Sequence, residues 1–156
     1  MKLIEQLYEA HLPVSNLKES ISFYENLGLE LSHTVDNRLA FFWIKKNKSW
    51  LGLWETEEAK SKYHPSTRHI AFSTSLDQLK NAVAWLKEKG IDPRGEFGFE
   101  PIEPFVMVTN DGIAHAKIYF NDPDKNSLEL ICKLENNSRV TKNMYLSAWE
   151  SIVKDS

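Results

Sequence analysis

Alternating apolar and polar positions near the start of the chain predict a strand that is followed by a helix. Residues 7–14 alternate in the way typical of a strand with one buried face. Residues 16–19 (Asn-Leu-Lys-Glu) have the spacing of a capping box, apolar residues then recur at helical spacing, and Gly28 supplies a stop. Further strands are predicted at 29–35, 38–44 and 49–54. The predicted order is therefore βαβββ.

A second copy of this pattern follows residues 56–66, a charged segment typical of a surface linker. Residues 67–74 alternate again, residues 75–78 repeat the capping-box spacing, and the helical series ends at Gly90. The remaining predicted strands are 91–99, 113–120 and 127–133, with a proline-bounded insertion at 101–110 before the last two. A repeat of this kind indicates two related modules.

The repeat predicts an α+β fold made of two paired βαβββ modules. Each set of strands turns its apolar residues toward its own helix, so we expect the opposite faces to meet in a mixed-sheet cup with the helices outside. Met144, Tyr145 and Trp149 lie at a spacing that suits a short C-terminal helix. We expect a single domain, 1–156, with module one at 5–55, the linker at 56–66, module two at 67–134 and a tail at 135–156.

The last predicted strand carries a glutamate, Glu129, on the face opposite its leucine neighbours, and packing of the strand against a helix does not require a carboxylate there. Alternation over residues 127–133 aims Glu129 away from its leucine neighbours, and a buried carboxylate needs a partner. The two strand–helix starts align His11 with His69, and the final strands align Gly52 with Glu129. We therefore expect the two histidines and the glutamate to share the concave face.

Composition and charge exclude several classes of function. The chain has 156 residues, 42% of them hydrophobic, which is enough for a core. A net charge of −3 without a basic block argues against nucleic acid as a partner. No apolar run approaches the roughly 18 residues of a membrane span, and no secretion signal opens the chain, so we expect a cytoplasmic protein that does not use a membrane. The single cysteine, Cys132, is expected to pack as a small hydrophobe.

Several stretches carry a resemblance to a known family. They are residues 11–17 (His-Leu-Pro-Val-Ser-Asn-Leu), 22–24 (Ser-Phe-Tyr), 27–29 (Leu-Gly-Leu), 68–73 (Arg-His-Ile-Ala-Phe-Ser), 119–124 (Tyr-Phe-Asn-Asp-Pro-Asp) and 127–130 (Ser-Leu-Glu-Leu). With these motifs the chain resembles the vicinal oxygen chelate superfamily, which includes glyoxalase I, fosfomycin-resistance thiol transferases, extradiol dioxygenases and bleomycin-binding proteins. The resemblance covers about residues 5–134. It implies paired modules around a U-shaped metal cup, commonly in a homodimer.

The resemblance also implies a set of site residues. His11, His69 and Glu129 match the metal ligands of the family, and two imidazoles with one carboxylate suit iron, manganese, zinc or nickel. Such a site leaves positions open for a small substrate that binds through oxygen. Tyr119 matches a tyrosine of the fosfomycin and extradiol enzymes and is predicted to orient or protonate the substrate. Glu9, on the face of His11, is predicted as a base.

Other positions depart from particular subfamilies. Glyoxalase I resembles this chain but has a fourth ligand, a glutamate, where Gly52 stands, and the nearby Glu55 has the opposite parity. Pro13 and Lys117 replace a small polar or thiol residue and a phosphonate-binding serine of the fosfomycin enzymes. His115 is the candidate for the additional histidine of extradiol dioxygenases.

The leading hypothesis is a glyoxalase- or dioxygenase-like divalent-metal enzyme that acts on a small oxygen-bearing substrate by isomerase, lyase or oxygenase chemistry. The alternative is a metal-free binding protein of the bleomycin-resistance kind, and a fosfomycin-modifying thiol transferase is a third hypothesis. The aromatic residues of module one could enclose a flat ligand. Substrate-binding roles are predicted for Trp43, Trp50, Trp54 and His115.

Overall fold

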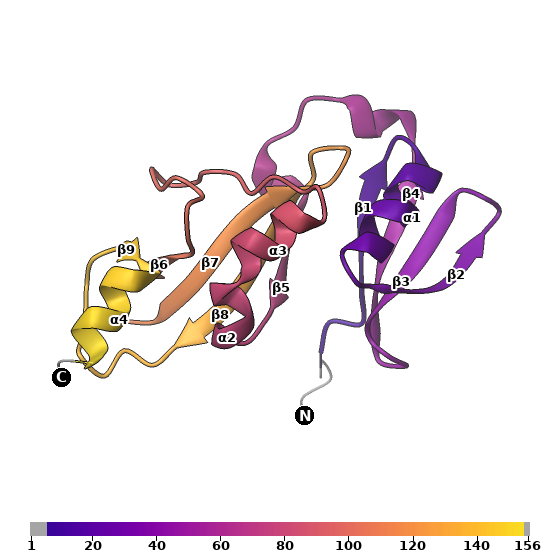
Figure 1. Ribbon diagram of the computed structural model, residues 1–156. Coiled ribbons are helices and arrows are strands. Elements are labelled where there is room, and N and C mark those ends of the chain that lie inside the picture. The colour runs from indigo at the N-terminus through magenta and orange to yellow at the C-terminus, as the bar shows by residue number, and fades with distance from the viewer. Residues whose placement is uncertain (1–5, 155–156) are drawn as a thin grey trace. The chain divides into compact units, whose positions relative to one another are not determined.

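A computed structural model describes residues 6–154, which divide into two compact units (Figure 1). Of these residues, the first unit holds those up to Arg68 together with Asp122–Asn126, and the second holds His69–Asn121 and those from Ser127 onward. Each unit contains one mixed β-sheet with helices packed on it, which confirms the predicted α+β class and the βαβββ-type modules.

The first unit is a four-stranded sheet covered by one α-helix. Its elements are β1 (Glu9–Val14), α1 (Leu17–Asn26), β2 (Glu30–Val35), β3 (Leu39–Lys45) and β4 (Ser49–Glu55), with the short 3-10 helices η1 (Glu57–Lys60) and η2 (Pro65–Thr67). The strand order is β1-β4-β3-β2, with β1 parallel to β4 and the other pairs antiparallel. Helix α1 begins after Asn16, whose side chain accepts a hydrogen bond from the Glu19 N–H. Tyr24 and Phe42 are fully buried between helix and sheet.

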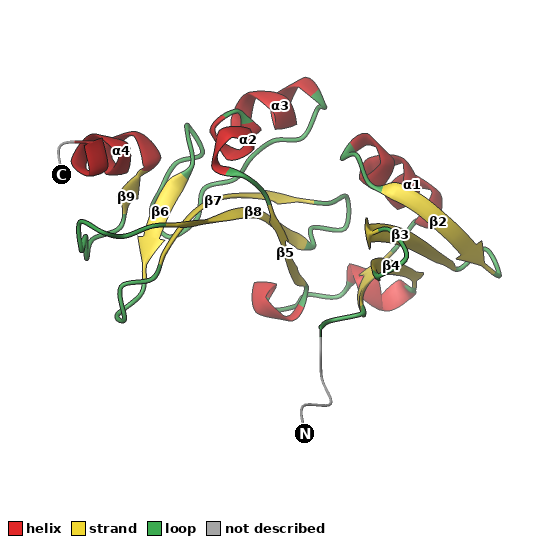
Figure 2. Ribbon diagram, turned by 90° about the horizontal axis from the view of Figure 1, so that it is seen from below, coloured by secondary structure: helices red, strands yellow, loops and turns green. Residues whose placement is uncertain are grey.

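The second unit is a five-stranded sheet with its helices on one side (Figure 2). Its elements are β5 (His69–Ser73), α2 (Leu76–Lys80), α3 (Ala82–Glu88), β6 (Phe105–Val108), β7 (Ala114–Asn121), β8 (Ser127–Leu134), β9 (Met144–Tyr145) and α4 (Leu146–Lys154). The order is β5-β8-β7-β6-β9, and β5 and β8 run parallel. Ile118, Phe120 and Leu128 are buried on the helix side, as their alternation predicts. Within residues 6–154, no helix combines the length and the hydropathy needed to cross a membrane.

The second strand of the second unit does not lie where the sequence predicts it. Residues 91–99 form only isolated bridges, and Phe105–Val108, inside the predicted insertion, pairs with β7 instead. Phe97 and Gly98 have positive φ angles, and Glu96 and Phe99 exchange backbone hydrogen bonds across them. This tight turn reverses the chain, so one continuous strand cannot form there. The predicted second helix is also divided, because Asn81 separates α2 from α3.

The turn Asp122–Asn126 between β7 and β8 belongs to the first unit, and buried polar contacts hold it there. The Tyr24 hydroxyl donates to Asp122 Oδ2 (3.0 Å), and Asn126 Nδ2 donates to the same oxygen (2.6 Å) and to the Pro13 carbonyl (3.0 Å). Burial raises the pKa of Asp122, while the Asn126 and Tyr24 hydrogen bonds oppose that rise.

Replacing Asp122 with alanine is expected to lower the free energy of unfolding by about 2–3 kcal/mol. The change leaves the Tyr24 hydroxyl and the backbone N–H of Asn126 buried without the carboxylate oxygens that accept their hydrogen bonds, and each such group carries a desolvation cost. Urea unfolding followed by circular dichroism measures the loss. Asp92 is exposed, so Asp92→Ala is the matched control, with an expected change within about 0.5 kcal/mol. Equal stability of the two variants would contradict the anchoring role of this turn.

Candidate functional site

His69 and Glu129 meet on the face of the second sheet that lies opposite the helices. β5 and β8 are paired in parallel with His69 beside Ser127, so Glu129 lies two residues further along β8. The two side chains lean toward each other, and His69 Nε2 is 3.1 Å from Glu129 Oε2. Glu129 is only 3% exposed. The structure thus brings together two of the three residues predicted as metal ligands.

The other ring nitrogen of His69 is fixed by Ser127. Nδ1 lies 3.1 Å from the Ser127 carbonyl oxygen and 3.2 Å from its hydroxyl. A carbonyl only accepts hydrogen bonds, so Nδ1 carries the proton and Nε2 is the nitrogen that faces the carboxylate. Arg94 Nη2 in turn donates to the Ser127 hydroxyl (2.7 Å). The sequence does not predict the contact of Arg94 with Ser127, because Arg94 lies outside the regular elements and no local pattern marks its partner.

Lys117 and Tyr119 of β7 approach the same carboxylate from the neighbouring strand. Tyr119 is directly opposite Glu129 in the antiparallel pairing. Lys117 Nζ is 3.1 Å from Glu129 Oε1, and its side chain is 14% exposed. The contact is an ion pair without hydrogen-bond alignment, since Oε1 has no hydrogen-bond partner among the described residues. Burial, then the hydrogen bond and charge of Glu129, raise the pKa of Tyr119 far above its ordinary value, so the phenol keeps its proton.

The His69–Glu129 pair fits a divalent metal ion. Two ligands that bind one ion at about 2.0–2.2 Å and at right angles are themselves about 3 Å apart. The measured 3.1 Å between Nε2 and Oε2 matches that spacing, and Oε1 is a buried oxygen with an unused acceptor position. Over residues 6–154, no three His, Cys, Asp or Glu side chains cluster closely enough to hold an ion together. His11 belongs to the other unit, so the complete set of three ligands stays a prediction.

In the first unit, His11 lies on β1 with its ring over Gly52 of β4. The two residues are paired, and a Cβ at position 52 would stand 2.4 Å from His11 Nδ1. Glu9 Oε1 is 3.4 Å from His11 Nε2, and Trp50 Nε1 donates to Glu9 Oε2 (2.6 Å). The Trp50 hydrogen bond, followed by that of His11, lowers the pKa of Glu9. These contacts give Glu9 a means of orienting His11, and its role as a base stays a prediction.

The pairing registers of the two units differ by two residues, which corrects the alignment made from the sequence. Gly52 is paired with His11, whereas the residue paired with His69 is Ser127. By register, the counterpart of Glu129 in the first unit is therefore Trp54 and not Gly52. The shift of two keeps every side chain on the predicted face. Glu55 is used elsewhere, because its Oε2 accepts the Leu17 N–H at the start of α1 (2.7 Å).

Aromatic side chains cover the His11 face of the first sheet. Phe41, Trp43 and Trp50 contact one another or a shared neighbour, with the Trp43 and Trp50 centroids 5.0 Å apart. His33 is exposed, and its ring stacks on that of Phe41 with the centroids 4.7 Å apart. A register irregularity between Leu31 and His33 brings it opposite Phe41, and the sequence does not signal such a bulge.

Trp54 and His115, the other residues predicted to bind substrate, are less enclosed. Trp54 is 48% exposed, and its ring centroid is 6.2 Å from that of His11. His115 lies four residues before Tyr119 on the same face of β7, about 13 Å away along the strand. Its cross-strand partners are Met107 and Lys133. The substrate-binding roles of the three tryptophans and His115 stay predictions.

Comparison with known protein families shows which family this chain belongs to. The family model described as Glyoxalase/Bleomycin resistance protein/Dioxygenase superfamily matches residues 6–130. The chain belongs to this superfamily. The resemblance inferred from its motifs is therefore confirmed.

Relatives within the superfamily differ in activity. The metallothiol transferase FosB of Shouchella clausii (strain KSM-K16) is 31% identical over 120 residues, which are 75% of this chain and 73% of that protein. Lactoylglutathione lyase of Agrobacterium tumefaciens has a TM-score of 0.60 at 18% identity and covers 84% of this chain and 96% of its own. Fosfomycin resistance protein FosX of Mesorhizobium loti has a TM-score of 0.60 at 19% identity, covering 88% and 100%. The two structural likenesses show the superfamily fold.

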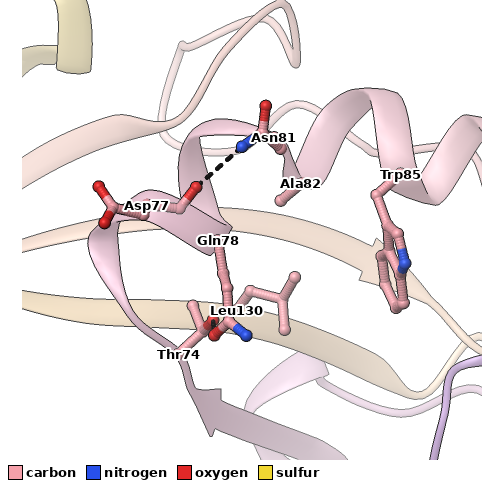
Figure 3. Close-up of a pocket in the computed structure, with 7 residues that line it drawn as sticks. All are labelled: Thr74, Asp77, Gln78, Asn81, Ala82, Trp85 and Leu130. Atoms are coloured by element: carbon pink, nitrogen blue, oxygen red, sulfur yellow. Dashed lines mark hydrogen bonds between the residues drawn. The ribbon is translucent and has the colours of Figure 1, made fainter.

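A separate cavity of about 540 Å³ lies on the helix side of the second unit (Figure 3). Residues of α2, α3 and β8 and of the turns beside the two helices line it: Thr74, Asp77, Gln78, Asn81, Ala82, Trp85 and Leu130. Leu130 points to the opposite face of β8 from Glu129, because neighbouring side chains alternate along a strand. This cavity is therefore distinct from the candidate site around Glu129.

Replacing Gly52 with alanine is expected to displace the His11 ring and to cost about 1–2 kcal/mol of stability, since an added Cβ overlaps the imidazole. A double-mutant cycle with His11→Ala isolates this overlap. In the His11→Ala background, Gly52→Ala should cost less than half as much, measured by urea unfolding. Equal costs in the two backgrounds would mean that the ring does not occupy the space above Gly52.

Proposed function

We propose that this chain is a divalent-metal enzyme that acts on a small oxygen-bearing substrate by isomerase, lyase or oxygenase chemistry. The observation that carries the proposal is the contact of His69 Nε2 with Glu129 Oε2 at 3.1 Å, beside a buried carboxylate oxygen that has no hydrogen-bond partner within residues 6–154. His69 and Glu129 would hold the ion, and His11 is proposed as the third ligand. Membership of the superfamily supports this assignment.

The protein groups near Glu129 suit proton transfer and substrate orientation. A bound Fe, Mn, Zn or Ni ion supplies Lewis-acid polarisation of substrate oxygen, or redox chemistry in the case of iron. Tyr119 keeps its proton, because burial and the Glu129 carboxylate raise its pKa, so it would donate a hydrogen bond or a proton to a substrate oxygen. Glu9 would act as base or would orient His11; its lowered pKa and its two hydrogen-bonded neighbours support orientation.

The aromatic side chains support a substrate with a flat or apolar portion. Trp43 and Trp50 pack against each other, and Trp54 leaves nearly half of its surface free. We propose these tryptophans as substrate-binding residues. His115 is proposed to line the same site at a position further along β7 from Tyr119.

Thiol transfer is the second candidate, and the 31% identity to a metallothiol transferase favours it. Lys117 and Pro13 depart from the pattern of fosfomycin-modifying enzymes, so a different electrophile would be the substrate. A screen that pairs low-molecular-weight thiols with fosfomycin and with simple epoxides tests this candidate. Thiol adducts that form only in the presence of the enzyme would establish it.

Elemental analysis of protein purified without added metal tests the leading proposal. We expect close to one equivalent of a first-row divalent metal per chain, or uptake of one equivalent by the metal-free protein on titration. Iron would direct the search to catechol and O₂, whereas nickel, manganese or zinc would direct it to Lewis-acid isomerase and lyase substrates. Neither bound nor acquired metal would overturn the proposal and leave a metal-free binding protein as the function.

We also propose that the chain forms a homodimer in the cytoplasm. The resemblance supports the dimer, and a single cysteine that is free in the structure suits a reducing compartment. Analytical ultracentrifugation should give twice the chain mass of 18.1 kDa. A monomer throughout the micromolar range would rule the dimer out.

A further inference from the structure

Lys117 is a charged side chain at the candidate site for which the proposed chemistry has no role. It projects from β7 so that its ammonium lies 3.1 Å from Glu129 Oε1, and only 14% of the side chain is exposed. His69 occupies the other carboxylate oxygen at 3.1 Å. Glu129 therefore already has a neighbour at each oxygen before any ion binds.

A metal ion and an ammonium compete for this carboxylate. An ion bound to Glu129 at about 2 Å would stand about 5–7 Å from the Lys117 ammonium, nearer on Oε1 and farther on Oε2, and like charges at that distance repel. The buried carboxylate also loses its pairing with lysine when it takes the ion. Lys117 must therefore weaken the affinity of the site for a dication.

The same charge favours an anion once the ion is bound. A dication and an ammonium beside one carboxylate leave two positive charges in excess, and the nearby Arg94 is already paired with Glu96. An ammonium released from Glu129 has no other acidic partner recorded among the described residues. An anionic oxygen of a bound molecule would pair with the Lys117 ammonium and reduce the excess of positive charge.

We propose that Lys117 is the resident cation of the site: it pairs with Glu129 while the metal is absent, and it pairs with an anionic oxygen of the substrate when the metal takes the carboxylate. This inference rests on the proposed metal function and names its substrate class. The substrate class is a small molecule that carries an anionic oxygen, such as a carboxylate.

The test measures two affinities on wild-type protein and on Lys117→Met. The first is the affinity of metal-free protein for Co²⁺, followed by calorimetry and by cobalt absorbance. The second is the affinity of the Co²⁺-loaded protein for oxalate, a dianion with two donor oxygens. Lys117→Met should bind Co²⁺ at least about tenfold more tightly and should bind oxalate at least about tenfold more weakly, each equivalent to about 1.4 kcal/mol.

Two further variants separate charge from structure. Lys117→Arg keeps the charge and should leave both affinities close to wild type. Lys133→Met removes an exposed lysine four residues beyond Glu129 on β8 and should also leave both unchanged. Lys117→Gln serves the same comparison if circular dichroism shows that the methionine variant is unfolded.

The opposite signs of the two changes make the outcomes distinct. Loss of both affinities in Lys117→Met would assign the lysine a merely structural role and overturn the inference. Unchanged affinities, or an arginine variant that behaves like the methionine variant, would also overturn it. Failure of every protein, wild type included, to bind Co²⁺ would remove the proposed metal function and this inference with it, whereas normal Co²⁺ binding with unaltered variants would remove the inference alone.

Discussion

Replacing Glu129 with glutamine is expected to weaken divalent-metal binding by about a hundredfold or more, equivalent to about 2.7 kcal/mol. Glu129 is only 3% exposed, and glutamine has nearly the same shape, so the substitution leaves no cavity. The change removes the only carboxylate that contacts His69 in the described part of the chain. Isothermal titration of metal-free protein with Co²⁺ or Ni²⁺ measures the effect.

Glu135→Gln is the matched control for this experiment. Glu135 follows β8 directly and is exposed, so its loss removes an equal charge from the same strand end without touching His69. The control should bind metal as wild type does. Glu129→Gln protein that is folded and binds the ion with wild-type affinity would refute the assignment of this carboxylate as a ligand.

Replacing His11 with alanine is expected to weaken metal binding by about tenfold to a hundredfold, because one imidazole ligand is lost while His69 and Glu129 remain. The fold should persist, since the ring rests on Gly52 and is partly exposed. The same titration measures the change, and circular dichroism checks that the first unit is folded.

His64→Ala controls for the loss of a histidine in the first unit. In the part of the chain that the structure describes, its imidazole forms hydrogen bonds only with Ser66, so the variant should leave metal affinity unchanged. An unaltered affinity in His11→Ala would mean that the first unit contributes no ligand. The site would then consist of His69, Glu129 and solvent or substrate oxygens.

The sequence was sufficient to predict the fold because two local patterns repeat. Alternation and capping boxes mark a strand and a helix twice, and these local signals match the global arrangement in both units. The prediction was wrong at residues 91–99, where Phe97 takes a positive φ that side-chain patterns do not signal. The strand Phe105–Val108 lies directly after the prolines at 101 and 104, and prolines of this kind favour a loop, so the sequence predicts an insertion over 101–110 instead.

For the site, the alternation of side chains along each strand predicts which residues share a face, but not which of them make contact. Parity placed His69 and Glu129 on one face, and the structure puts them in contact. Alternation puts Lys117 on the same face as Glu129 but says nothing about side-chain direction along a strand, so it does not predict their ion pair. The link from Arg94 through Ser127 to His69 joins three separate segments, and no local pattern encodes it.

Anomalous diffraction from crystals of the protein grown with Ni²⁺ or Zn²⁺ tests the central claim most directly. We predict one strong anomalous peak per chain, within about 2.0–2.2 Å of a ring nitrogen of His69, a carboxylate oxygen of Glu129 and a ring nitrogen of His11. A peak bound only to other residues, or no peak in protein that is otherwise well ordered, would contradict the claim that this chain is built to hold a catalytic metal.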